Sequence, residues 1–132
     1  MSQETPEAFA RRVAAAFSLG LDEYMALHAP DVVHVTAPEW PEGGTYRGTE
    51  AVRGLWESMY AAQDYRAEVE DVVVLDDSRV LSTLRIHSRG VASEVATTTV
   101  IYTVGTEREG LISRIEYYLD RGQALKAAGL EE

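Results

Sequence analysis

The sequence predicts an α+β fold, in which a cone-shaped, strongly bent and mostly antiparallel sheet is closed by three helices from the N-terminal half. Two observations carry this prediction. Apolar residues recur at helical spacing up to about residue 60, and from residue 65 onward they recur at every second position. The later strands are each about ten residues long, which favours a bent sheet. The predicted element order is ααβαββββα, in one domain over residues 1–132.

The first helix is marked at both ends. Thr5 is a favourable N-cap, Pro6 suits the first helical position and Gly20 can end the helix. The apolar stripe between these ends consists of Phe9, Val13, Ala16 and Phe17. A shorter helix is predicted from about Asp22, and it ends before Pro30.

The next elements are a strand, a loop and a third helix. Residues 32–37 are rich in β-branched side chains and predict a strand. Residues 38–48 contain several prolines and glycines and predict a loop. Thr49 can cap the third helix, whose apolar stripe consists of Val52, Leu55, Trp56, Met59 and Tyr60.

Four long strands and a short helix complete the chain. The strands are predicted over residues 65–75, 79–89, 94–106 and 111–119. The segments between them are short and rich in turn residues, so consecutive strands are expected to pair as antiparallel hairpins. Asp120 followed by Gln123 is a capping-box pattern, which predicts a last helix that ends at Gly129.

The composition excludes several classes of function. Acidic residues outnumber basic residues 22 to 12, and the net charge of −10 disfavours binding to nucleic acid. No apolar run approaches the ~20 residues that span a bilayer. Cysteine is absent, which excludes disulfides, thiolate metal sites and a cysteine nucleophile. The first residues are acidic and polar, so we expect no secretion signal and a cytoplasmic protein.

A cone of this kind encloses a space, and the aromatic residues are candidates to line it. Tyrosine outnumbers phenylalanine seven to two, which suits a cavity in which rings need polar partners. His87 shares a strand face with Arg85 and Arg89, which could also be a solvated outer stripe. The expected pocket residues are Tyr24, Thr36, Trp40, Tyr46, Trp56, Tyr60, His87, Thr98, Tyr102 and Tyr117.

Several segments resemble the SnoaL-like family of the nuclear-transport-factor-2-like superfamily. They are residues 29–33, residues 44–52 before and into the third helix, and residues 112–120 followed by residues 124–130. The element order is similar to that of the family over essentially the whole chain. The resemblance implies the cone fold, and it implies a homodimer formed through the outer face of the sheet.

The resemblance does not select one reaction, because the family includes cyclases, isomerases, epoxide hydrolases, dehydratases and members with no known reaction. The catalytic groups of ketosteroid isomerase would fall at Val13, Thr36 and Val100, which lack the required chemistry. The nearest match to the pattern of limonene epoxide hydrolase, residues 85–87 with Tyr117, replaces two of its three groups. These two activities are disfavoured, and a polyketide cyclase stays open.

His34 and Glu94 are the candidates for acid–base catalysis. The ordinary pKa of histidine lies near neutrality, and His34 shares a strand face with Thr36, which the family layout directs into the cone. Glu94 begins the more apolar face of its strand, where burial would raise the pKa of its carboxyl group. The alternatives are a packed, structural His34 and a Glu94 that lies in water at the strand end.

The sequence therefore predicts a protein that binds a small apolar or aromatic molecule. It is either an acid–base enzyme of polyketide cyclase or isomerase type or a non-catalytic ligand-binding or accessory dimerisation domain. A hydrogen-bonded polar pair in the pocket would favour the enzyme, and a fully apolar or filled pocket would favour the alternative. No metal-ligand spacing is present, so we expect no metal and no cofactor. The expected partners are the small molecule and a second copy of the chain, with no nucleic acid and no membrane.

Overall fold

The structure, a computed structural model, describes residues 4–37 and 43–130. The helices in these residues are α1 (Pro6–Leu19), α2 (Leu21–Met25), α3 (Thr49–Ala62) and α4 (Arg121–Ala128). The strands are β1 (His28–Thr36), β2 (Gly44–Arg47), β3 (Gln63–Val74), β4 (Arg79–Gly90), β5 (Ala96–Arg108) and β6 (Leu111–Tyr118). None of the described helices is long and apolar enough to cross a membrane.

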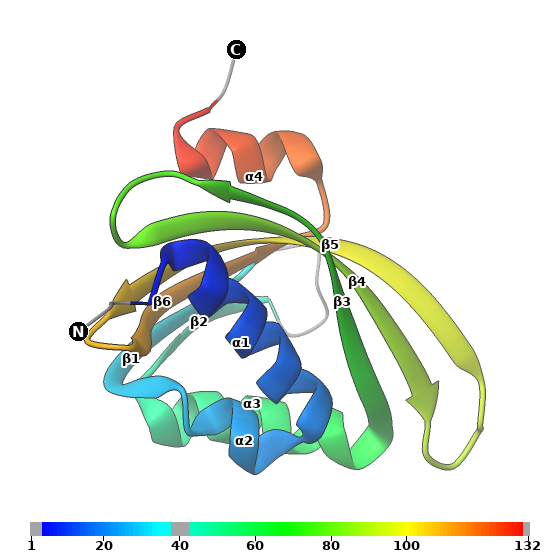
Figure 1. Cartoon of the computed structure of the whole chain (residues 1–132). Coiled ribbons are helices and arrows are strands. Elements are labelled where there is room, and N and C mark those ends of the chain that lie inside the picture. Colours follow the sequence, from blue (N-terminus) through cyan, green and yellow to red (C-terminus); the bar gives the residue numbers. More distant parts are fainter. Residues whose placement is uncertain (1–3, 38–42, 131–132) are drawn as a thin grey trace.

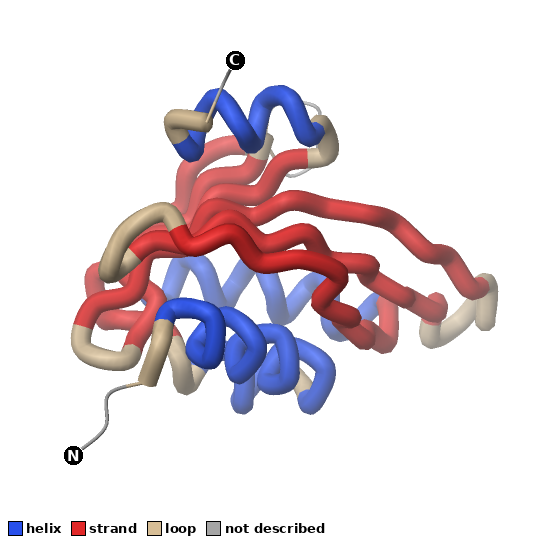
Figure 2. The backbone as a smooth tube through the Cα atoms, turned by 45° about the horizontal axis from the view of Figure 1, so that its top comes forward, coloured by secondary structure: helices blue, strands red, loops and turns tan. Residues whose placement is uncertain are grey.

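The strands form one strongly bent sheet in the order β2-β1-β6-β5-β4-β3. β1 and β6 run parallel, and the other neighbouring strands run antiparallel. Helices α1, α2 and α3 lie against the concave face (Figure 1), and α4 lies on the opposite, convex face (Figure 2). This arrangement confirms the predicted α+β cone.

The alternation of side chains along each strand separates the two faces of the sheet. On β4, Ser82 and Leu84 face α1 across the pocket described below. The preceding residue on β4, Leu81, faces the opposite way, because it packs with Val104 of β5 against Ala124 of α4. The concave face therefore supplies the candidate site, and the convex face carries a second, smaller core.

The predicted ends of the first and last helices are confirmed. Thr5 Oγ1 accepts a hydrogen bond from the backbone N–H of Ala8 (3.1 Å), which caps α1. Asp120 Oδ2 accepts a hydrogen bond from the backbone N–H of Gln123 (2.9 Å), which caps α4. Gly129 ends α4 in the left-handed conformation, with φ of 79°.

Two boundaries near the third helix differ from the prediction. Residues 44–47, expected in a loop, form β2, because they pair with β1 in antiparallel register. Thr49 is the first residue of α3 and not its cap. The cap position belongs to Gly48, whose φ of 85° turns the chain from β2 into the helix.

The second helix is shorter than predicted. α2 ends at Met25, and the chain joins the sheet soon afterwards, because Leu27 O accepts a hydrogen bond from Ile112 N of β6 (2.7 Å). His28 therefore begins β1 and is buried. Pro30 is tolerated in this strand because the register between β1 and β6 is irregular after His28.

Candidate functional site

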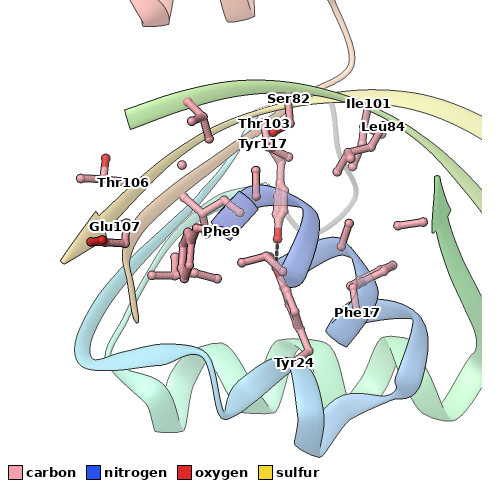
Figure 3. Close-up of a pocket in the computed structure, with 18 of the residues that line it drawn as sticks. Phe9, Phe17, Tyr24, Ser82, Leu84, Ile101, Thr103, Thr106, Glu107 and Tyr117 are labelled. Carbon is pink, nitrogen blue, oxygen red and sulfur yellow. Dashed lines mark hydrogen bonds between the residues drawn. The ribbon is translucent and has the colours of Figure 1, made fainter. Parts of the chain in front are cut away.

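A pocket lies between α1 and the concave face of the sheet (Figure 3). Helix α1 contributes Pro6, Phe9, Ala10, Val13, Ala14 and Phe17. The strands opposite contribute mainly apolar side chains, among them Val80, Leu84, Ile86, Ile101, Ile112 and Ile115. Because apolar surface is stabilised by leaving water, this lining favours an uncharged and largely hydrocarbon ligand.

Four buried aromatic side chains, here called the ring cluster, line one part of the pocket: Phe17, Tyr24, Trp56 and Tyr117. The Trp56 ring centroid lies 5.4 Å from that of Phe17, 5.5 Å from that of Tyr24 and 5.7 Å from that of Tyr117. All three contacts are edge-to-face, an arrangement that aromatic pairs favour. The ring cluster joins α1, α2, α3 and β6.

The hydroxyl groups of Tyr24 and Tyr117 are hydrogen-bonded to each other inside the ring cluster (Figure 3). Burial raises the pKa of Tyr24, and burial followed by the neighbouring Tyr24 raises the pKa of Tyr117. Both phenols therefore stay protonated over the physiological pH range. The pair supplies hydroxyl groups at the pocket wall and no negative charge.

The pocket has room for a small ligand. The volume open to the centres of water-sized spheres is about 70 Å³. One water molecule needs roughly 10–15 Å³ by this measure, so the space corresponds to several waters or to a ligand of about one ring.

The polar part of the lining consists mostly of hydroxyl groups. They belong to Ser78, Ser82, Thr103 and Thr106, and the carboxylate of Glu107 lies in the same wall. Figure 3 shows Thr106 and Glu107 at one end of the pocket and Phe17 at the other. Among the described residues, the lining contains no histidine, lysine, arginine or aspartate. The site therefore has several hydroxyl groups that can donate and accept hydrogen bonds. It has no histidine, the side chain that most often takes up a proton near neutral pH.

His34 lies inside the cone but does not line the pocket. Its side chain is 1% exposed, and its Nε2 lies 2.9 Å from Thr36 Oγ1. Its ring centroid is 4.6 Å from that of Tyr117 and 5.8 Å from that of Trp56. Burial lowers the pKa of His34 to about 4, with a smaller effect of the nearby His28 in the same direction. Histidine at this position is neutral at physiological pH.

Glu94 lies in the exposed turn between β4 and β5 and not on the apolar face of a strand. Its backbone N–H donates to Gly90 O (2.9 Å), which closes the turn, and its φ is 59°. Strand β5 begins two residues later, at Ala96. The structure therefore does not bring Glu94 together with the buried His34.

Three residues expected in the pocket lie on the convex face instead: His87, Thr98 and Tyr102. Tyr102 packs against the core under α4, and His87 Nδ1 lies 3.2 Å from Thr98 Oγ1. His87 Nε2 also lies 3.3 Å from Glu68 Oε1, as expected for a solvated outer stripe. The reason is the phase of the alternation on β5, where Thr103 faces the pocket and its neighbour Tyr102 must face outward.

Three further candidates, Thr36, Tyr46 and Tyr60, do not line the pocket. Tyr60 donates its hydroxyl hydrogen to Phe17 O (2.6 Å), which holds α3 against α1. Tyr46 of β2 is paired with His34 of β1, and their ring centroids are 5.8 Å apart. Trp40 lies outside the described residues.

The wall formed by α1 and by the hydroxyl groups of the sheet was not predicted from the sequence. The apolar stripe of α1 was recognised, but helical periodicity is the same for a stripe that faces the core and for one that faces a pocket. Ser82 and Thr103 are polar positions within otherwise apolar strand faces, and this break in the alternation was the available signal. In the described ranges, no group of three or more His, Cys, Asp or Glu side chains is placed to hold a metal ion.

We predict that His28 and His34 make the stability of the fold depend on pH. Burial lowers the pKa of each from 6.5 to about 4. Between these values the unfolded chain binds more protons than the folded chain, so the free energy of unfolding rises from about pH 4 to about pH 6.5 and then levels off. Each histidine contributes on the order of 3 kcal/mol to this rise.

Urea unfolding at several pH values between about 4 and 8 measures this effect. His34→Gln should reduce the rise to about half, because glutamine does not titrate and His28 still does. His87→Gln, which changes a histidine on the outer face of the sheet, is the matched control and should keep it. An equal pH dependence in wild type and His34→Gln would contradict the prediction.

The chain matches one known protein family. A family model described as the SnoaL-like domain matches residues 5–115. A comparison with curated protein sequences found no match.

Solved structures share the fold at low sequence identity. A candidate polyketide cyclase from Pseudomonas putida KT2440 is 21% identical, with a TM-score of 0.71, over 90% of this chain and 94% of that chain. RV0760c from Mycobacterium tuberculosis, solved with estradiol-17beta-hemisuccinate, is 18% identical, with a TM-score of 0.72, over 89% and 95% of the two chains. A ketosteroid isomerase-like protein from Catenulispora acidiphila DSM 44928, solved with trimethylamine, is 18% identical, with a TM-score of 0.70, over 96% and 95%.

These identities show a common fold and do not by themselves transfer an activity. The family model covers most of the described chain, including α1, β4 and β5 and the ring cluster residues Phe17, Tyr24 and Trp56, and it ends within β6. The protein therefore belongs to the SnoaL-like family.

Proposed function

We propose that this protein binds a small, uncharged and largely apolar molecule of about one ring in the pocket between α1 and the sheet. The observation that carries the proposal is an apolar pocket with room for such a ligand beside the ring cluster. The protein's own charge of −10 and the Glu107 carboxylate in the pocket wall disfavour an anionic ligand.

The solved relatives support binding as the common property of this fold. One was crystallised with a steroid ester and another with trimethylamine. These two ligands differ widely in size and charge, so the fold alone does not select one ligand class. For this chain, the ligand class is therefore inferred from the residues that line the pocket.

The experiment is a titration with toluene, followed by ¹H–¹⁵N NMR, in wild type and in Gly105→Leu. Gly105 lies in the pocket wall, its φ is outside the left-handed region, and a Cβ atom there would meet nothing within 4 Å. A leucine side chain should therefore fill the pocket without a clash. We expect toluene to shift the amide signals of pocket residues in wild type and to bind at least about tenfold more weakly to Gly105→Leu.

Gly105→Leu should also unfold at higher urea concentration, since glycine in a strand costs about 0.5–1 kcal/mol and the new side chain buries apolar surface. Gly54→Ala is the matched control, because Gly54 lies on an exposed face of α3 with open space at its Cβ position. It should leave toluene binding unchanged. Equal binding of toluene by Gly105→Leu and wild type would reject the pocket as the site.

A second candidate function is an acid–base enzyme of polyketide cyclase or isomerase type. The observation that favours it is the hydrogen-bonded pair of Tyr24 and Tyr117, which offers hydroxyl groups to a reacting oxygen. A solved relative is a candidate polyketide cyclase. His34, behind Tyr117, remains the proposed acid–base residue of this alternative, and its buried Nδ1 is unpartnered among the described residues. Glu94 is no longer proposed, because it lies in the exposed turn between β4 and β5. Binding without turnover is better supported, because the described lining holds no histidine.

We also propose that two copies of the chain pair through the convex face of the sheet. Beyond α4, this face presents side chains of both charges next to apolar ones. Arg85 is paired with Glu70 (3.0 Å), and Val100 lies opposite Arg85 in the register of β4 and β5. Such a mixed face suits contact with an identical face, in which opposite charges can meet across a two-fold axis.

Sedimentation equilibrium should give a mass of twice the 14.6 kDa of one chain. Val100→Asp places a charge in the middle of the proposed interface and should shift the protein to the monomer mass. Leu19→Asp is the control, because Leu19 is 74% exposed at the end of α1, away from the convex face. A wild-type protein with the mass of one chain would refute the dimer.

A further inference from the structure

A row of four hydroxyl groups crosses the concave face of the sheet. Ser82 of β4 is paired with Thr103 of β5, Thr103 with Tyr117 of β6, and Tyr117 with Thr36 of β1. Residues paired directly across neighbouring strands point to the same face, with Cβ atoms about 4.5–5.5 Å apart. The row therefore runs side by side across four strands.

The two ends of this row differ in their hydrogen bonding. Thr36 is bonded to His34, and Tyr117 is bonded to Tyr24. Ser82 and Thr103 are each 5% exposed and line the pocket. In the part of the chain that the structure describes, neither of these two hydroxyls forms a hydrogen bond. Figure 3 shows them next to each other, close to Tyr117.

A hydroxyl group that faces an apolar pocket and has no protein partner can form a hydrogen bond only with a ligand or a water molecule that enters the pocket. Around Ser82 and Thr103 the wall is hydrocarbon, with Leu84 next along β4 and Ile101 next along β5 on the same face. A hydroxyl can both donate and accept, so the two together match a carbonyl or hydroxyl oxygen. No positive charge lines the pocket in the described residues, so a carboxylate would be buried without compensation.

We propose that Ser82 and Thr103 form a subsite for one neutral oxygen atom, a carbonyl or hydroxyl oxygen, on an otherwise apolar ligand. The inference rests on the proposed function, since it concerns the ligand bound in the same pocket. It narrows the ligand class from hydrocarbon rings to oxygen-bearing rings such as aryl ketones and phenols. A site built to pair with an oxygen discriminates against an analogue without it.

The test compares two probes of nearly the same shape. Acetophenone carries a carbonyl oxygen where α-methylstyrene carries a CH₂ group. Their dissociation constants are measured by NMR titration with the wild type and with the double variant Ser82→Ala/Thr103→Val, which removes both hydroxyls at nearly constant volume. Thr99→Val is the matched control, because it is the same change on the same face of β5 outside the pocket wall.

We expect the wild type and Thr99→Val to favour acetophenone over α-methylstyrene by about fivefold or more, the effect of one to two net hydrogen bonds. The double variant should lose this preference and bind α-methylstyrene at least as well as the wild type. If both probes bind and their ratio is the same in the double variant, the oxygen subsite is rejected and the proposed function stands. If neither probe binds to the wild type, the proposed function fails and the subsite with it.

A second measurement, the urea midpoint of the double variant, needs no ligand and shows whether the variant is folded. If the two hydroxyls are unpartnered in the free protein, replacing them by apolar groups of the same shape should keep or raise the urea midpoint. A lower midpoint for the double variant would show that the hydroxyls already serve the fold, and it would overturn the inference. The single variants Ser82→Ala and Thr103→Val show which of the two hydroxyls causes the change in probe preference and in urea midpoint.

Discussion

The packing of three separate helices on the inside of one bent sheet depends on the ring cluster. Phe17, Tyr24 and Trp56 come from α1, α2 and α3, and Tyr117 comes from the last strand. Their edge-to-face contacts fix the distance between the helices and the sheet. The pocket lies beside these rings, between α1 and the concave face of the sheet.

The same packing decides which polar groups have a chemical role. His28 and His34 are enclosed by the fold and held neutral by burial, so they act on the stability of the protein. His28 Nδ1 donates to Tyr24 O, which ties the start of β1 to α2 beneath the ring cluster. Most of the polar groups that reach the pocket are instead hydroxyls, which keep their protons at physiological pH. Such a wall is suited to orienting a neutral ligand through hydrogen bonds.

The two faces of the sheet serve different purposes because α4 covers only part of the convex side. Under α4, Leu81 and Val104 pack with Ala124 and Ala128 in a closed core. Farther along β4 and β5, the same face carries ion pairs and half-buried side chains open to a partner. Ligand binding and pairing between copies can therefore use opposite faces of the same strands.

The sequence by itself determined the class of fold, the ends of α1 and α4 and the four long strands, because these follow from periodicity and from local capping chemistry. Tyr24, Trp56 and Tyr117, three of the residues expected from the sequence to line a pocket, lie in the wall of the pocket between α1 and the sheet. Only the tertiary structure decided that β2 is a strand, that His28 and His34 are buried and neutral, and that Tyr102 and Thr98 face outward. The reason is physical: strand pairing, burial and the phase of alternation depend on residues distant in sequence. The position of Ser82 beside Thr103 is set by the register between β4 and β5, which no local pattern encodes.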